Sequence, residues 1–211
     1  MRRFSGHREA WGEFVDVKTG AAHILRKQLR RAKPGRVWVS SVTDAYQPIE
    51  RKFRLTRACL EALLEVQFPV DVLTRSPLCL RDLDLFEKFR EFSAGFSLGT
   101  DDDSLRALFE PRAPSIQCRV SALRTLHAAG IRTYAFLGPL LPLDPERLVD
   151  MLSGCVDSVL IDRMNYGSRI AWLYRKQRLE KYLSDSYFSE IGNELHSRFS
   201  RAGVEATILY Q

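Results

Sequence analysis

The sequence predicts an α/β protein whose parallel strands form a partial (β/α) barrel. Apolar stretches typical of buried strands alternate with amphipathic stretches typical of helices, which is the pattern of strands joined by right-handed crossovers. Polar residues follow most of the strands, as they do at the functional end of a barrel. No G-x-G-x-x-G sequence opens a helix, which disfavours a dinucleotide-binding sheet. The 211 residues, 45% of them hydrophobic, suffice for one domain with a sizeable core.

Two strands lie between amphipathic helices in the first half of the chain. Ile24 and Leu29 fall on the apolar side of an otherwise basic helix, which Pro34-Gly35 ends. Apolar residues at spacings of three and four predict the later helices. The elements expected here are helix 21–31, strand 37–42, helix 54–66, strand 70–74 and helix 81–90.

The second half continues the alternation. Gly130 closes a long helix, Asp144 with Pro145 opens another, and Gly138-Pro139 ends a strand. The expected elements are strand 94–98, helix 101–108, helix 115–129, strand 131–137, helix 144–153, strand 156–161, a largely helical tail over 168–202 and a final strand 205–209.

Positive charge is concentrated at the N-terminal end. The net charge is +6, and residues 1–36 hold ten Lys and Arg against three acidic residues. Such a segment suits a polyanion, so DNA or another nucleic acid is a candidate partner, while a solvated helix face is the plainer interpretation. No run of about 18 apolar residues predicts a membrane span, and the start lacks the apolar stretch of a secretory signal. A cytoplasmic protein without a membrane partner is therefore expected.

Polar side chains follow four of the first five strands. Thr43 and Asp44 follow the first strand, Arg75 the second, Ser97 and Thr100 the third, and 162–166 the fifth. Taken singly, each is explained by a turn, a helix cap or a surface ion pair; Asp101, for example, suits a helix cap. Because the carboxyl ends of parallel strands meet at one edge, together they predict one polar rim able to hold a zwitterion or a ribose.

Several stretches carry a family resemblance over roughly residues 4–167. They are VWVSSVTDAYQPIE (37–50), VLTRSPLCLRDLDL (72–85), GFSLGTD (95–101), FEPRAPS (109–115) with Arg119, and IDRMNYG (161–167). They resemble the radical S-adenosylmethionine (radical SAM) enzymes of the spore photoproduct lyase-like group, also described as DNA repair photolyase-like.

This resemblance implies a partial barrel of six strands that holds a [4Fe–4S] cluster and S-adenosylmethionine. In the family, an electron from the cluster cleaves the sulfonium and gives a 5′-deoxyadenosyl radical, and the electron comes from a donor such as a flavodoxin or a ferredoxin. The resemblance places Thr43 and Asp44 at the methionine end of the cofactor, Arg75 at its carboxylate and Ser97 at its ribose. Thr100 completes the candidate cofactor-binding set.

Two departures from the family pattern concern cysteine. The family holds its cluster with C-x3-C-x2-C on a loop after the first strand, whereas the cysteines here are Cys59, Cys79, Cys118 and Cys155, too widely spaced for one loop. The chain is therefore expected to lack the cluster loop and the first barrel strand, and to be inactive on its own. The second departure is at Ser41, near which spore photoproduct lyase has a hydrogen-donating cysteine. A hydroxyl is a poor hydrogen-atom donor, so repair by that route is not expected.

The sequence leaves two other functions open. One is a non-catalytic relative that binds nucleic acid through its basic N-terminal segment, with Phe4, Trp11 and Phe14 interleaved among the charges. The other is an ordinary barrel hydrolase or aldolase, which no histidine at a predicted strand end supports.

The boundaries and the first strand give two further expectations. Residues 1–167 are expected to form the radical SAM-like barrel, and 168–211 a helical extension with a final strand. With no strand before 37–42, its exposed apolar edge would favour self-association.

Overall fold

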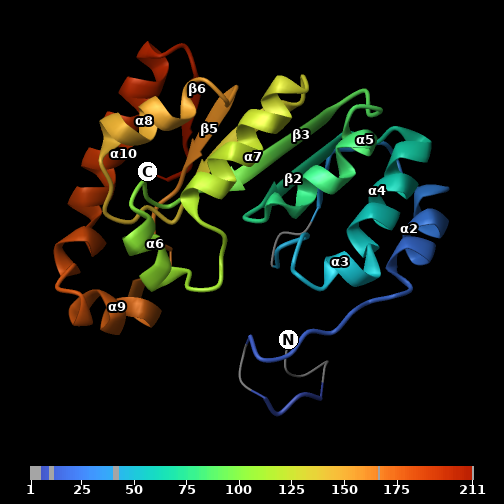
Figure 1. Ribbon diagram of the computed structural model, residues 1–211, viewed down its shortest axis with the longest axis horizontal. Helices are drawn as coiled ribbons and strands as arrows, with labels where there is room; N and C mark the ends of the chain where they lie inside the picture. Colours follow the sequence, from blue (N-terminus) through green and yellow to red (C-terminus); the bar gives the residue numbers. More distant parts are fainter. Residues whose placement is uncertain (1–5, 10–11, 40–42, 166, 211) are drawn as a thin grey trace.

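The computed structural model describes residues 6–9, 12–39, 43–165 and 167–210. Within them, six strands form one sheet in chain order, each parallel to the next (Figure 1). The first pairing sets Val37 against Val70 and the last sets Ile161 against Ile208. The strands are β1 (Val37–Val39), β2 (Val70–Thr74), β3 (Phe92–Ser97), β4 (Arg132–Leu137), β5 (Ser158–Ile161) and β6 (Glu205–Ile208). Adding every strand to the same side of the previous one builds the wall of a partial barrel, so the predicted fold class is confirmed.

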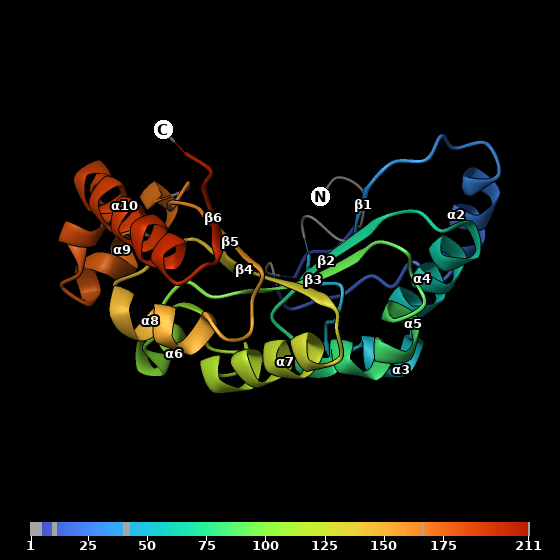
Figure 2. The same cartoon turned by 90° about the horizontal axis from the view of Figure 1, so that it is seen from above.

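The helices lie mainly on one side of the curved sheet. Figure 2 shows α3, α5, α7 and α8 along this side, with α2 and α4 at one end and α9 and α10 at the other. The helices are α2 (Ala21–Leu29), α3 (Glu50–Phe53), α4 (Leu55–Val66), α5 (Leu83–Phe86), α6 (Asp103–Phe109), α7 (Ile116–Ala128), α8 (Pro145–Leu152), α9 (Gly167–Lys176) and α10 (Asp185–Arg201), with 3-10 turns η1 (Pro77–Asp82) and η2 (Glu180–Leu183).

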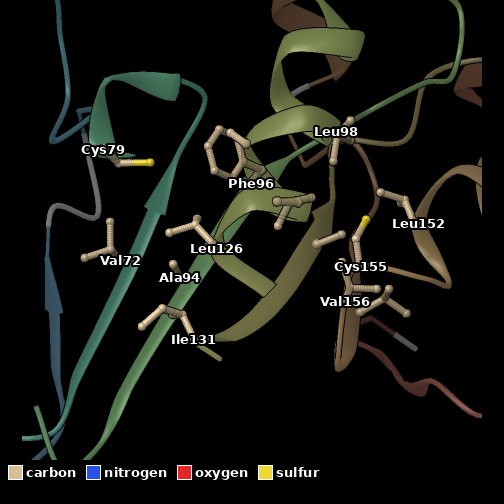
Figure 3. Close-up of a cluster of buried hydrophobic side chains, with 14 of the residues drawn as sticks. Val72, Cys79, Ala94, Phe96, Leu98, Leu126, Ile131, Leu152, Cys155 and Val156 are labelled. Atoms are coloured by element: carbon tan, nitrogen blue, oxygen red, sulfur yellow. The ribbon is translucent and has the colours of Figure 1, made fainter. Parts of the chain in front are cut away.

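The core lies between the sheet and this helical layer. Val72, Ala94 and Phe96 alternate along β2 and β3 so that they face Leu126 of α7, as Figure 3 shows, and all four are at most 2% exposed. Burying a side chain such as Leu126 contributes about 1.5–3 kcal/mol, so this layer supplies much of the driving force for folding. The opposite face carries the residues in between, including the half-buried Phe136.

Some local predictions were wrong in instructive ways. The stretch 81–90 is not one helix: Ser76 caps the 3-10 turn η1, in which Pro77 takes the first position, and only the four residues of α5 are α-helical. Asp101 does not cap α6. The cap is Asp102, whose side chain accepts the N–H groups of Ser104 and Leu105.

The C-terminal part of the chain extends the same sheet. β6 pairs with β5, and α10 packs against β6 and α8. The predicted final strand is therefore present, while the proposed boundary at residue 167 stays a prediction. None of the helices in the described residues combines the length and the apolar composition needed to cross a bilayer.

Candidate functional site

Asp44 joins the loop after β1 to the end of β2. Its Oδ1 accepts the Thr74 hydroxyl at 2.6 Å and the Tyr46 N–H at 2.8 Å. Its Oδ2 accepts the backbone N–H of Arg75 at 2.8 Å. The turn at Asp44 thus brings two predicted site residues, Asp44 and Arg75, to one rim. Because both carboxylate oxygens already accept protein donors, the main task of Asp44 in this structure is to position Arg75.

The Arg75 side chain continues the network toward α7. Its Nε donates to Oε1 of Glu110 at 2.7 Å, and Oε2 of Glu110 accepts from Arg119. Glu110 follows α6, and Arg119 lies in the second turn of α7. The side chain of Arg75 is 39% exposed and that of Arg119 is 1% exposed. The triad therefore runs from the buried side chain of Arg119 to a guanidinium that reaches solvent at the rim.

Electrostatics keep this triad ionised. Burial alone would raise the pKa of Glu110, but the positive charges of Arg75 and Arg119 and their hydrogen bonds outweigh it, so the pKa of Glu110 lies below its ordinary value. Burial lowers the pKa of Arg119, while Glu110 works in the opposite direction. An arginine keeps its proton in proteins, so the buried pair remains an ion pair.

Ser97 is joined to the same network through its backbone. It ends β3, is 4% exposed, and its carbonyl accepts Nη1 of Arg119 at 2.8 Å. The ends of β1, β2 and β3 are thereby connected through hydrogen bonds from Asp44 to Ser97.

Thr100, the last predicted contact, is 1% exposed and donates to the Pro142 carbonyl at 2.7 Å. It also accepts the N–H of Asp102 at 3.2 Å. The structure therefore commits this hydroxyl to holding two loops together, and its contact with a ligand stays a prediction.

Thr43 is exposed at the same rim and has an interaction of its own within the protein. The stretch 40–42, which includes Ser41, lies outside the described residues, as do Phe4 and Trp11. The placement of Thr43 at the methionine end of the cofactor stays a prediction.

A cavity of about 430 Å³ opens beyond the end of β5. Arg163 lies at its edge and pairs with Asp185 at 3.3 Å rather than with Asp162. Asp162 accepts instead from the side chain of Asn165 at 3.0 Å. The polar lining comes from Arg163, Asn165, Ser168 and Asp185, and the apolar lining from Met164, Leu183 and Phe188.

The cysteines do not form a site for an iron–sulfur cluster. Cys79 and Cys155 are buried, and burial raises the pKa of Cys79 to about 12, whereas Cys118 is exposed on α7. Within the described ranges no three His, Cys, Asp or Glu side chains gather in a way that would hold a metal ion. The residues present therefore do not fit a [4Fe–4S] cluster.

Part of the basic N-terminal charge lies at the C-terminal end of α2 and just beyond it. Lys27, Arg30 and Arg31 surround a hollow of about 460 Å³, and Figure 1 shows α2 beside α4 at one end of the molecule. Part of the charge is neutralised, because Arg26 pairs with Glu65 and Arg36 pairs with Asp71. Lys27, Arg30 and Arg31 thus form a cationic surface at this end of the molecule.

Sequence reasoning missed the roles of Glu110 and Arg119. Both stand in or beside FEPRAPS, the stretch used for the resemblance, but neither follows a strand directly. The available signal was an acidic residue just after one helix and an arginine near the start of the next, and only the folded chain brings both to Arg75.

Solved structures with the same architecture are radical SAM enzymes. Spore photoproduct lyase with bound AdoMet and dinucleoside spore photoproduct matches with a TM-score of 0.63 and 16% identity, covering 93% of this chain and 67% of that one. SuiB of Streptococcus suis bound to S-adenosylmethionine matches with a TM-score of 0.55 and 12% identity, covering 93% of this chain and 43% of that one. The chain therefore has the radical SAM partial-barrel fold, as predicted.

Related sequences are found in archaea, bacteria and a phage. An uncharacterised protein of Methanocaldococcus jannaschii is 37% identical over 141 residues, which are 66% of this chain and 53% of that protein. An uncharacterised protein of Mycobacterium tuberculosis is 32% identical over 147 residues, 66% of this chain and 43% of its own length.

A radical SAM Nα-GlyT isomerase of Pseudomonas phage M6 is 26% identical over 129 residues, 61% of this chain and 27% of its own length. No family model matches the chain. The chain spans about half the length of the first two relatives.

Proposed function

We propose that the rim formed by the ends of β1, β2 and β3 binds S-adenosylmethionine, as part of a radical SAM enzyme of the spore photoproduct lyase-like group. The observation that carries the proposal is the continuous hydrogen-bond network from Asp44 through Arg75 and Glu110 to Arg119 and Ser97. It holds a cation and a strand-end serine at one edge of a parallel sheet, where barrels bind their ligands.

The chemistry of Arg75 suits the amino-acid end of the cofactor. Its Nε is committed to Glu110, whereas its terminal nitrogens make no hydrogen bond within the described part of the chain. A guanidinium edge matches the two oxygens of a carboxylate in a bidentate pair. Ser97, at the end of the neighbouring β3, carries a hydroxyl able to donate to and accept from a ribose.

The proposal for residues 1–211 is limited to cofactor binding. In the family, reductive cleavage of the sulfonium requires the iron–sulfur cluster, and none of the four cysteines of this chain fits one. An electron donor such as a flavodoxin or a ferredoxin belongs to the same cluster-dependent step. Both are proposed only for a protein that supplies cluster ligands in addition to this rim.

Calorimetric titration with S-adenosylhomocysteine tests the proposal directly. We expect measurable binding, and a loss of about ten- to a hundredfold in Arg75→Met, since a hydrogen bond to a charged group contributes about 1.5–3 kcal/mol. Arg132→Met is the matched control, because Arg132 is 65% exposed at the opposite end of its strand. Absence of binding by the unaltered chain, or equal affinities of the two variants, would contradict the proposal.

A second candidate function is nucleic-acid binding through the basic residues at the C-terminal end of α2 and just beyond it. The cationic hollow lined by Lys27, Arg30 and Arg31 is the observation that favours it. Each neutralised phosphate releases counterions, so affinity for a single- or double-stranded oligonucleotide should fall steeply between about 50 and 200 mM salt. Fluorescence anisotropy should show a shallower salt slope in Arg30→Ala/Arg31→Ala. A slope that does not change with these substitutions would reject this cationic surface as the contact.

A further inference from the structure

We infer that Glu110 and Arg119 are positioning residues that fix the guanidinium of Arg75 for the carboxylate of the bound cofactor. The inference rests on the proposed function and goes one step beyond it, because it assigns a task to two residues that would not touch the ligand. It also predicts that removing them weakens the binding of the carboxylate and not that of the nucleoside.

Arg119 provides the rigid end of the arrangement. Its Nε donates to the Pro114 carbonyl at 3.0 Å, its Nη1 to the Ser97 carbonyl at 2.8 Å, and its Nη2 to Glu110. The guanidinium is planar, so three bonds to three different segments determine its position and orientation together. With 1% of its side chain exposed, Arg119 has no access to a ligand in solvent. Its effect on binding can therefore only pass through its partners.

Glu110 transmits this fixed position to the rim. One carboxylate oxygen accepts from Arg119 and the other from Nε of Arg75 at 2.7 Å. The carboxylate cannot rotate without losing one of two charge-assisted hydrogen bonds, which are about twice as strong as neutral ones. The Arg75 side chain, which would otherwise sample many rotamers, is thereby held at its Nε.

The backbone of Arg75 is fixed separately. Its N–H donates to Oδ2 of Asp44, and Asp44 also holds Thr74. A change at Glu110 should therefore release the guanidinium while leaving the backbone of β2 in place. This separation makes a positioning role distinguishable from a general loss of structure.

The test compares two ligands that differ in the group that Arg75 would bind. S-adenosylhomocysteine carries the amino-acid end with its carboxylate, whereas 5′-methylthioadenosine has the same thioether nucleoside without the amino-acid end. In the unaltered chain we expect tighter binding of the first. In Glu110→Gln this preference should fall by about tenfold, a typical coupling between residues in contact, while the affinity for 5′-methylthioadenosine stays unchanged. Glu146→Gln is the matched control, since Glu146 is 75% exposed on α8.

Three further variants test whether Glu110 and Arg119 act on the ligand through Arg75. Arg119→Lys keeps the charge but loses the planar fork, so it should reduce the same preference. Glu110→Asp keeps the charge but shortens the reach and should do likewise. In an Arg75→Met background, Glu110→Gln should have no further effect on the preference, because the group it positions is gone.

The outcomes separate the inference from the proposed function. If the unaltered chain binds neither ligand, the proposed function fails and the inference falls with it. If the unaltered chain prefers S-adenosylhomocysteine and Glu110→Gln keeps that preference, the inference is overturned and the proposed function stands. Equal losses for both ligands would show a purely structural triad and would also overturn the inference.

Discussion

Replacing Gly95 with alanine should bring a methyl group into the ring of Tyr134. Gly95 lies in β3 directly opposite Tyr134 of β4. A Cβ built on Gly95 would lie 2.3 Å from Cε2 and Cζ of Tyr134, whereas ordinary contacts begin at 3.4 Å. The ring is 6% exposed, and its hydroxyl donates to the Val72 carbonyl at 3.2 Å, so it cannot move aside freely.

The expected loss of folding stability has two causes, a shift of the Tyr134 ring and a weaker hydrogen bond to Val72. The ring must shift by about 1 Å within a packed sheet, and overpacking of this kind costs about 1–3 kcal/mol. The shift also breaks or weakens the hydrogen bond to Val72, worth about 0.5–1.5 kcal/mol. Together these give about 1.5–4.5 kcal/mol of destabilisation, or roughly 3–18 °C in Tm for a domain of this size.

A double-mutant cycle measures the clash itself. Denaturant unfolding of Gly95→Ala, Tyr134→Ala and the double variant gives the coupling energy between the two positions. In the Tyr134→Ala background, Gly95→Ala should be neutral or stabilising by about 0.4–1 kcal/mol, because alanine restricts the unfolded chain more than glycine does. Tyr134→Phe serves as the control, since it removes the hydroxyl but keeps the ring and should leave the clash intact.

The coupling energy decides the outcome. If Gly95→Ala lowers the free energy of unfolding equally with and without the Tyr134 ring, the close approach of the two residues is refuted. A cost below about 0.5 kcal/mol in the unaltered background would refute it as well, because surface-like substitutions fall in that range.

Three further predictions concern thiols, acid stability and association. Cys118 should react with a thiol reagent within minutes in the native protein, while Cys79 and Cys155 should react only on unfolding, because burial raises the pKa of both; fast modification of all thiols in the native state would contradict the burial. The pKa of Glu110 lies below its ordinary 4.5, so its stabilising contribution is complete above that pH and is lost as pH falls through the lowered value. Acid unfolding of Glu110→Gln should therefore show a flatter pH dependence, and parallel curves for the two proteins would count against the ion triad. The outer edge of β1, next to Trp38 with 53% exposure, should promote self-association; sedimentation should show a dimer that Trp38→Lys weakens, whereas a monomer at high concentration would reject the edge as an interface.

The alternating pattern predicted the architecture well because each element buries one face against the same core. β2 was predicted with its observed bounds, and α8 began at the Pro145 that the sequence singled out. The errors lie where a local signal has two possible structures. Pro77 suits the first turn of either an α-helix or a 3-10 helix. The structure has the 3-10 helix η1 here, and η1 packs against α7.

The site was predictable only in part, for a physical reason. Topology alone puts the ends of parallel strands at one edge, so Asp44, Arg75 and Ser97 could be grouped from their positions after the strands. Which partner each side chain takes depends on loops whose course the periodic pattern does not specify. The pairing of Arg75 with Glu110, 35 residues away, is of this kind.

The hydrogen bonds distinguish between the candidate cofactor-binding residues, whereas the positions of these residues in the sequence did not. Thr100 and Asp44 stand at strand ends, yet their oxygens already have donors or acceptors from the protein, so binding a ligand would require breaking existing bonds. Arg75 uses one nitrogen for the protein and directs a half-exposed guanidinium to the rim. A binding site needs unmet hydrogen-bonding capacity that buried groups hold in place, and at this rim Arg75, with the Glu110–Arg119 pair behind it, provides that capacity.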